Sequence, residues 1–230
     1  MFQVYTWIEM GKKITALKVQ KKNQQRVNVY LGGEFAFGLS RIVAGSLHIG
    51  QELDDSKIVQ LKDEDAQEIN YQRAIRFLGY RMRSSSEIKE HLKQNGISED
   101  IIESVVNRLG RNGLIDDKQF AQLWVENRNE FRPRSHRMLL VELNKKGIHP
   151  DIINQVLNDT SADEELVFKA AENQVRKYRN LEWQEFRRKL SSFLARRGFS
   201  YSIINPVVDQ IWAERDSENQ SGLIKHKNYG

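Results

Sequence analysis

The stretch Leu92-Lys93-Gln94-Asn95-Gly96-Ile97 decides how this chain folds, because the same pattern returns twice, at residues 143–148 and 194–199. The glycines of the three stretches, Gly96, Gly147 and Gly198, stand one constant interval apart, and apolar residues keep the same register on both sides of each glycine. A period of roughly fifty residues with this arrangement is typical of repeated supersecondary units. We therefore predict three copies of one module.

Local signals indicate that each module contains three helices. Ser84, with Glu87 three residues later, forms a capping box that starts a helix. Gly96 ends this helix, since glycine takes the left-handed backbone conformation without strain. Ser98 is expected to cap the helix that follows, and apolar residues at helical spacing predict an earlier helix over residues 66–81.

The second and third copies have the same joints with different residues. Asp116, with Gln119 as its capping-box partner, starts a helix that Pro133 ends, because the residue before a proline is pushed out of helical geometry. Pro150 suits the first position of a later helix, where its missing N–H costs nothing. Ser161 is expected to cap the third copy, with Glu164 as its partner. The remaining helices are expected over about residues 116–129, 135–146 and 203–212.

Alternation of apolar and polar residues predicts a small β-rich domain before the modules. Residues 14–20 and 26–31 form a hairpin in this prediction, and residues 35–39 and 57–61 form a third and a fourth strand. The acidic run at residues 63–65 places the end of this domain near residue 65. The predicted organisation is an N-terminal domain over 1–65, three-helix repeats over 66–115, 116–160 and 161–216, and a flexible polar tail over 217–230.

Composition restricts the classes of function. The 230 residues include no cysteine, which excludes disulfides, thiolate nucleophiles and iron–sulfur ligands. We expect a cytoplasmic protein, because no apolar run approaches the ~20 residues that span a bilayer and residues 1–7 do not resemble a targeting signal. The net charge of +5 is uneven, with ten Lys or Arg against five Asp or Glu in residues 169–215, which suggests an acidic partner for that end.

No catalytic, cofactor or metal site is predicted. The five histidines lack the spacing of a metal-binding helix, and no phosphate-binding glycine loop is present. Asp116 and Asp117 are adjacent at a helix start, where a capping role explains them better than a pair of catalytic carboxylates. An enzyme would need distant carboxylates, such as Asp116 with Glu126, to meet around a metal.

Basic residues concentrate around the helix joints of the second and third copies. Those in the last turn of a helix are partly explained by the helix dipole, and the others form either a solvated surface or a contact with an acidic protein or a phosphate backbone. The candidate partner-binding residues are Arg128, Arg132, Arg134, Arg137, Lys145, Lys146, Arg176, Lys177, Arg179, Arg187, Arg188, Lys189, Arg196 and Arg197.

One segment of the second copy resembles a known family. Asp116 and Asp117 are followed at fixed spacing by Phe120, Ala121 and Trp124. Taken alone, the apolar members of this segment indicate core packing. Together with the elements around Gly96, Gly147 and Gly198, the segment is similar to the RecX regulatory family over about residues 70–212.

This resemblance implies a protein without enzymatic activity that modulates the RecA recombinase. The implied fold is mainly α, with three tandem three-helix repeats forming an elongated, curved body behind the small β-rich domain. The implied partner is the RecA–DNA filament, whose groove the repeats occupy, so that strand exchange and ATP hydrolysis are inhibited. No cofactor and no membrane contact are expected, and a monomer is the simplest oligomeric state.

The competing hypothesis is a direct DNA-binding protein, since three short helices with a glycine between the last two resemble a helix-turn-helix. The third helices of the first two copies begin with Glu99-Asp100 and Pro150-Asp151, acids that oppose phosphates, and only the helix that begins at Tyr201 lacks them. We therefore expect weak, salt-sensitive DNA binding rather than sequence-specific reading.

Overall fold

The computed structural model describes residues 12–227, apart from the side chains of Asn173 and of residues 216–227. Residues 1–7, which were assessed for a targeting signal, lie outside the described residues. The chain divides into two compact units, one of residues 1–83 and 87–115, the other of residues 84–86 and 116–230. Each unit is described by itself.

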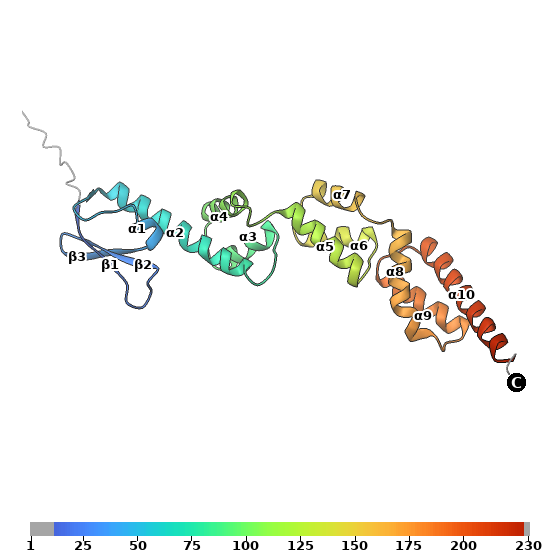
Figure 1. Cartoon of the computed structure of the whole chain (residues 1–230). Coiled ribbons are helices and arrows are strands. Elements are labelled where there is room, and N and C mark those ends of the chain that lie inside the picture. The colour runs from blue at the N-terminus through green and yellow to red at the C-terminus, as the bar shows by residue number, and fades with distance from the viewer. Residues whose placement is uncertain (1–11, 228–230) are drawn as a thin grey trace, which may run out of the picture. The chain divides into compact units, whose positions relative to one another are not determined.

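The first unit opens with a four-stranded antiparallel sheet in the order β3-β2-β1-β4 (Figure 1). The predicted hairpin is confirmed, and Gly32 and Gly33, both at positive φ, make the tight turn into the predicted third strand. One face of the sheet is buried, with Val29 and Leu39 at its centre. The strands are β1 (Lys12–Val19), β2 (Arg26–Leu31), β3 (Glu34–Ser40) and β4 (Glu52–Leu53).

The predicted strand over residues 57–61 is wrong, because these residues belong to helix α2 (Asp55–Leu78). Asp54 caps this helix by accepting a hydrogen bond from the backbone N–H of Lys57 at 2.6 Å. Ile58 and Leu61 are three residues apart and both pack against the sheet core, which satisfies the helical period instead of the alternating one. The short helix α1 (Arg41–Ala44) precedes β4.

Helix α2 extends from the sheet into the first three-helix module (Figure 1). Leu61 lies in the core of the sheet, whereas Tyr71 and Ala74 lie in the core of the module. Between them Asp65, itself buried, accepts hydrogen bonds from the backbone N–H of Ser40 and from the guanidinium of Arg26 at 3.0 Å. One continuous helix therefore holds both cores of this unit.

The first module is completed by α3 (Ser85–Gln94) and α4 (Glu99–Arg111). Its core contains Ile88, Leu92 and Leu109, all without exposed surface. Gly96 has the predicted positive φ, at 75°. Ser98 occupies the N-cap position of α4, but its side chain makes no capping hydrogen bond, so that part of the prediction is wrong.

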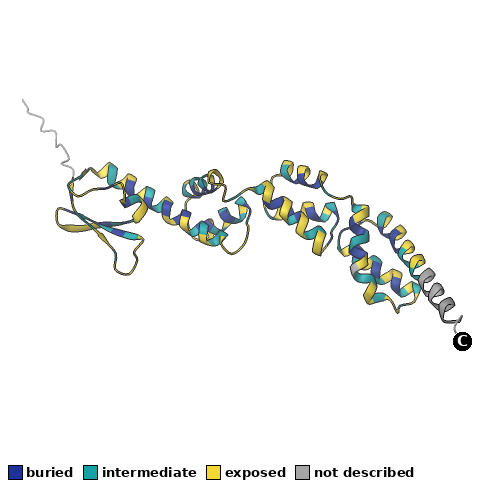
Figure 2. Ribbon diagram, in the orientation of Figure 1, coloured by how far each residue is buried: buried dark blue, intermediate teal, exposed yellow. Residues whose placement is uncertain are grey.

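The second module begins as predicted. The Asp116 carboxylate accepts from the backbone N–H groups of Lys118 and Gln119, at 2.8 and 3.0 Å. Phe120 and Ala121 are buried in the module core, which confirms that this stripe packs inward. Figure 2 shows that buried and exposed residues alternate along the helices, as expected for helices with one buried side. Its helices are α5 (Asp117–Phe131), α6 (His136–Lys145) and α7 (Pro150–Asn158).

The third module differs from the prediction at both ends. Its first helix begins after Ala162, which has no side-chain cap, while the carbonyl of Ser161 accepts from His136 Nε2 at 3.0 Å, so Ser161 is not the cap. The last helix contains Pro206 and continues to Lys227, through most of the segment expected to be a flexible tail. The elements are α8 (Asp163–Val175), the 3-10 turn η1 (Arg176–Tyr178), α9 (Trp183–Arg196) and α10 (Tyr201–Lys227).

In the second unit, the residues around Gly147 and Gly198 contact serines at the start of an earlier helix, α3 for Gly147 and α6 for Gly198. The carbonyl of Lys146, next to Gly147, accepts from Ser84 Oγ at 2.6 Å. The carbonyl of Arg197, next to Gly198, accepts from the backbone N–H of Ser135 at 3.1 Å. Both serines are buried, at 0 and 1% exposure.

Acids at the next module's first helix complete the two joints. Asp117 Oδ1 accepts from the backbone N–H of Ser85 at 2.8 Å, and Asp163 Oδ1 accepts from that of His136 at 2.7 Å. Each acid satisfies a first-turn N–H of a helix that has no partner within its own helix. Asp117 therefore acts across a joint, whereas Asp116 caps its own helix.

The glycine joints generate a stability prediction. Gly96 and Gly147 both have positive φ, so alanine at either position costs about 1 to 2 kcal/mol of backbone strain. A Cβ at Gly147 also overlaps the Ser86 side chain, whereas a Cβ at Gly96 meets no atom of the described residues within 4 Å. We expect Gly147→Ala to lower the free energy of unfolding by about 1 to 3 kcal/mol more than Gly96→Ala. Urea denaturation followed by circular dichroism measures the free energy of unfolding of both variants. Equal losses would contradict a close contact between Gly147 and Ser86.

Candidate partner-binding surface

The structure separates the fourteen basic residues predicted to bind a partner into three groups. Four are held by contacts inside their own module, three line one hollow of the second unit, and seven are exposed on the surface. The internal group is Arg128, Arg134, Lys146 and Lys189, the hollow group is Arg132, Lys177 and Arg197, and the exposed group is Arg137, Lys145, Arg176, Arg179, Arg187, Arg188 and Arg196.

Glu142 on α6 organises the internal group of the second module. Its carboxylate accepts from Trp124 Nε1 at 2.8 Å and from Arg128 Nε at 2.7 Å, and it forms an ion pair with Arg134. The Arg128 guanidinium also lies over the Trp124 ring, 4.5 Å from its centroid. Two of the predicted partner-binding arginines therefore stabilise the module through a half-buried carboxylate.

Equivalent positions of the first module hold a different set of contacts. His91, one repeat before Glu142, stacks on Phe77 with the ring centroids 3.8 Å apart. The Arg83 guanidinium covers the same Phe77 ring, 3.5 Å from its centroid. Burial, with the charges of Arg83 and Arg73, lowers the pKa of His91 below its ordinary value. The first module thus has an aromatic stack where the second has ion pairs.

Arg197 lies where the second and third modules meet. Its guanidinium is half-buried and lies 4.9 Å from the centroid of the Phe193 ring. Burial lowers the pKa of Arg197, and the nearby charges of Arg134, Arg132 and Arg128 lower it further. The sequence did place basic residues at this joint, and the structure brings these four together.

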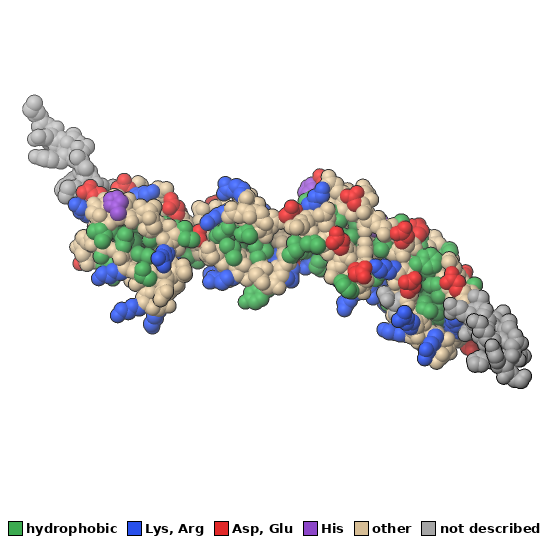
Figure 3. Space-filling model, in the orientation of Figure 1, with side chains coloured by type: hydrophobic (Ala, Val, Ile, Leu, Met, Phe, Trp, Pro, Cys, Tyr) green, Lys and Arg blue, Asp and Glu red, His purple; other side chains and the backbone are tan. Residues whose placement is uncertain are grey.

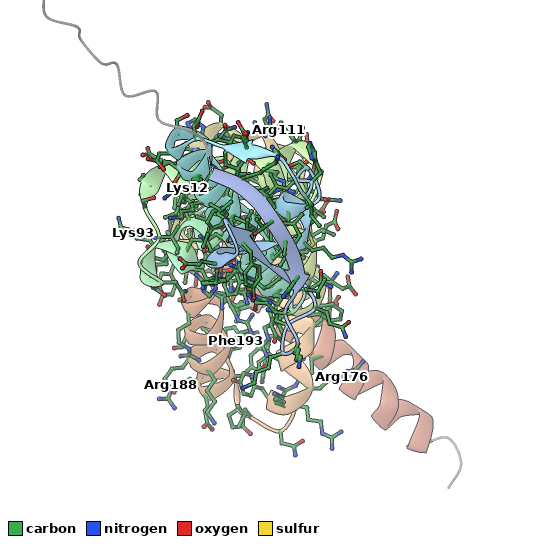
Figure 4. All side chains as sticks on the ribbon, turned by 90° about the vertical axis from the view of Figure 1, so that its left-hand side faces the viewer. Lys12, Lys93, Arg111, Arg176, Arg188 and Phe193 are labelled. Carbon is green, nitrogen blue, oxygen red and sulfur yellow. The ribbon has the colours of Figure 1, made fainter. Side chains whose placement is uncertain are left out.

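The exposed group lies mainly on the third module. Figure 3 shows basic side chains gathered around α9 and the segment before it. Arg176 and Arg188 both belong to this module, and the Arg188 side chain extends away from the helices (Figure 4). Arg187 lies 5.6 Å from the centroid of the Trp183 ring, and Lys189 pairs with Glu185 at 2.8 Å. The accessible positive charge of α9 is therefore that of Arg187, Arg188 and Arg196.

Sequence reasoning missed two features of this surface. Glu142 was interpreted only as part of the resemblance around Gly147, although its carboxylate carries the charge that balances Arg128 and Arg134. Tyr80 and Phe131 were also missed, although they are exposed at 86 and 70% and stand one repeat apart, each followed by an arginine. Comparing equivalent positions of the copies would have found the pair of aromatic residues.

In the described part of the chain, no group of three or more histidine, aspartate or glutamate side chains has the geometry to hold a metal ion. Asp116, one of the carboxylates considered for such a site, is occupied by helix capping. Among the same residues no helix is long and apolar enough to cross a membrane.

Four family models match consecutive parts of the chain. The RecX N-terminal domain matches residues 12–54, and the first, second and third RecX three-helix domains match residues 71–109, 116–157 and 162–208. The chain belongs to the RecX family. The three RecX three-helix domains follow one another in the order of the three predicted copies.

Individual RecX proteins agree with this assignment. Regulatory protein RecX of Bacillus subtilis (strain 168) is 32% identical over 92% of this chain and 82% of its own length. Regulatory protein RecX of Leuconostoc mesenteroides is 30% identical over 94% of this chain and 82% of its own length. A crystal structure of regulatory protein RecX superposes with a TM-score of 0.70 at 30% identity, covering 86% of this chain and 99% of its own. The crystal structure of RecX from Lactobacillus salivarius superposes with a TM-score of 0.55 at 26% identity, and it covers 64% of this chain and 97% of its own. The relatives are named as regulatory proteins, not as enzymes.

The cluster around Glu142 predicts a loss of stability when its charge is removed. Glu142→Gln leaves Arg128 and Arg134 without their shared counter-charge, and we expect it to lower the free energy of unfolding by about 3 kcal/mol. The exposed Glu126→Gln is the matched control and should stay within about 0.5 kcal/mol of the unchanged protein. Urea denaturation measures both, and a similar effect of the two substitutions would argue against the cluster.

The stack of His91 on Phe77 predicts that the thermal stability of the protein depends on pH. The folded protein binds a proton at His91 more weakly than the unfolded chain does. The neutral ring therefore contributes to stability at pH values above the ordinary pKa of histidine. This contribution is lost as the pH falls through the lowered pKa of His91 in the folded protein. We expect the Tm of the unchanged protein to fall more steeply between about pH 7.5 and about pH 5 than that of His91→Phe. His48→Gln, at an exposed histidine, serves as the control, and parallel curves for His91→Phe and the unchanged protein would refute the effect.

Proposed function

We propose that this protein regulates the RecA recombinase in DNA repair and recombination. In this proposal it acts in the cytoplasm as a monomer, binds the groove of the RecA–DNA filament, and inhibits strand exchange and ATP hydrolysis. The observation that carries the proposal is the repetition of one joint, in which Lys146 and Arg197 accept hydrogen bonds from the preceding module's serine. Tandem copies of one module carry equivalent residues at a constant interval of sequence, which suits a partner that repeats, such as a filament. The curvature of the stack stays a prediction.

The exposed side chains support a contact with a protein–DNA polymer. Tyr80 and Phe131 are exposed at equivalent positions of two modules, and each is followed by an arginine. Aromatic residues and arginine are enriched among the residues that contribute most to binding at protein interfaces. The exposed basic residues of α9 add the positive charge that an acidic partner or a phosphate backbone requires.

Direct reading of DNA by the third helix of each module is the second candidate, and one residue favours it. Tyr201 begins α10 and is 60% exposed, without an acid in the first turn of that helix. The corresponding helices α4 and α7 carry acids in their first turns, which repel phosphates. The repeated surface therefore fits a filament better than a base sequence.

The proposal is tested by adding this protein to RecA on single-stranded DNA and measuring ATP hydrolysis and strand exchange. We expect inhibition at well below one copy per RecA subunit, because one bound regulator affects a filament of many subunits. Unchanged RecA activity, together with tight binding to DNA alone that weakens steeply with salt, would overturn the proposal in favour of direct DNA binding.

The part played by α9 is tested by charge reversal. Arg187→Glu combined with Arg188→Glu removes exposed positive charge, and we expect about tenfold more protein to be needed for the same inhibition, because a like charge then faces an acidic partner. Lys21→Glu with Lys22→Glu makes the same change of charge in the exposed loop between β1 and β2. Equal effects of the two pairs would show that net charge, not the face of α9, determines inhibition.

A further inference from the structure

A hollow of about 290 Å³ lies in the second unit, where the end of α5 faces α8, η1 and α9. Three cations line it, Arg132 after α5, Lys177 in η1 and Arg197 after α9. Its single acid, Glu130, is engaged with Lys169, whose Nζ lies 2.7 Å from the Glu130 carboxylate. The lining is therefore strongly positive.

The positive charge of this hollow is not balanced within the described residues. Glu142 neutralises part of the charge of Arg128 and Arg134, but Arg132, Lys177 and Arg197 form no ion pair in the described part of the chain. The Nη1 atom of Arg197 is buried and has no hydrogen-bond partner there. A buried donor without a partner costs free energy. An anion in the hollow would balance the charge of the three cations that line it.

The size of the hollow and its aromatic residues narrow the class of anion. At about 290 Å³ it lies just below the range in which whole small molecules are enclosed, so it fits one group of a longer molecule. Phe131, 70% exposed, stands beside Arg132 on the rim, and Phe193 lies beneath Arg197. Proteins bind single-stranded nucleic acid without reading its sequence by placing cations along the phosphate backbone and an exposed aromatic ring against a base.

We propose that this hollow binds a phosphodiester group of single-stranded DNA, with Phe131 stacking on the neighbouring base. Arg132, Lys177 and Arg197 contact the phosphate, and the exposed Arg176 and Arg179 next to Lys177 continue the positive path along the strand. The inference deepens the proposed function, since it names the DNA of the filament as a contact of the second unit. An acidic protein segment would also be attracted to these cations, but it has no base on which Phe131 would stack.

The experiment measures binding of a short fluorescein-labelled oligothymidylate to the full chain by fluorescence anisotropy, without RecA and over a series of salt concentrations. Phe131→Ala should weaken binding by about tenfold, with an unchanged salt slope, because it removes one stacking contact and no charge. Arg132→Ala and Lys177→Ala should each reduce the slope of log affinity against log salt by about 0.7. All three side chains lie on the surface or rim, so the fold should persist, which circular dichroism checks.

Matched substitutions outside the hollow make the result specific. Phe35→Ala removes an exposed aromatic residue of β3, and Arg111→Ala removes an exposed arginine of α4. Both should leave affinity within about twofold of the unchanged protein. If Phe35→Ala weakens binding as much as Phe131→Ala, or Arg111→Ala as much as Arg132→Ala, the binding is diffuse and the proposal is overturned. Displacement of the oligonucleotide by polyglutamate at equal charge concentration would also overturn it, in favour of an acidic protein.

The two proposals fail separately. If Phe131→Ala and Arg132→Ala bind oligothymidylate like the unchanged protein while RecA is still inhibited, the hollow does not bind DNA and the proposed function stands. If the unchanged protein binds oligothymidylate through the hollow but leaves RecA activity unaltered, the DNA site stands and the regulation of RecA is refuted.

Discussion

The close approach of a glycine to the serine of the preceding module is the constraint on which the second unit depends. A Cβ at Gly198 would lie 2.9 Å from the Cβ of Met138 and would also overlap Ser135, so only glycine lets the two backbones come together. The carbonyl beside the glycine then accepts a hydrogen bond from a serine that is fully buried. Because a buried serine without a partner is costly, register errors between neighbouring modules are penalised.

Around this constant joint, the modules use different chemistry at equivalent positions. Glu142 in the second module, His91 in the first and Phe193 in the third stand one repeat apart, and each contacts an arginine or an aromatic ring. An ion-pair cluster, a ring stack and a cation–ring contact all cover the same side of a small helical core. The glycine contacts therefore preserve the architecture, whereas the residues at the positions of His91, Glu142 and Phe193 give each module its own charge and exposed surface.

The repeats and most of the helices could be predicted from the sequence because they depend on local signals. The interval between Gly96, Gly147 and Gly198, the cap at Asp116 and the break at Pro133 each act within a few residues. Residues 57–61 were mistaken for a strand because a short apolar run satisfies both periods, and only packing of Leu61 against the sheet decides between them.

The candidate site was harder to predict, because its chemistry depends on contacts between segments that are distant in sequence. Basic residues near the joints were identified, but Arg128 and Arg134 could not be distinguished from Arg132 without knowing that Glu142 faces the first two. The role of Asp117 was missed for the same reason, since its carboxylate accepts a hydrogen bond from the backbone N–H of Ser85, which is distant in sequence.

The contact between glycine and serine also has a direction. Joining two modules needs a serine on one and a docking glycine on the next. At the position equivalent to Ser84 and Ser135 the third module has Phe186, whose ring is buried in its own core, so the serine contact is not repeated there. At the other end Gly96 has no serine to meet among the described residues, and α2 leads to the sheet instead. Each module therefore differs from its neighbours in which half of this contact it carries.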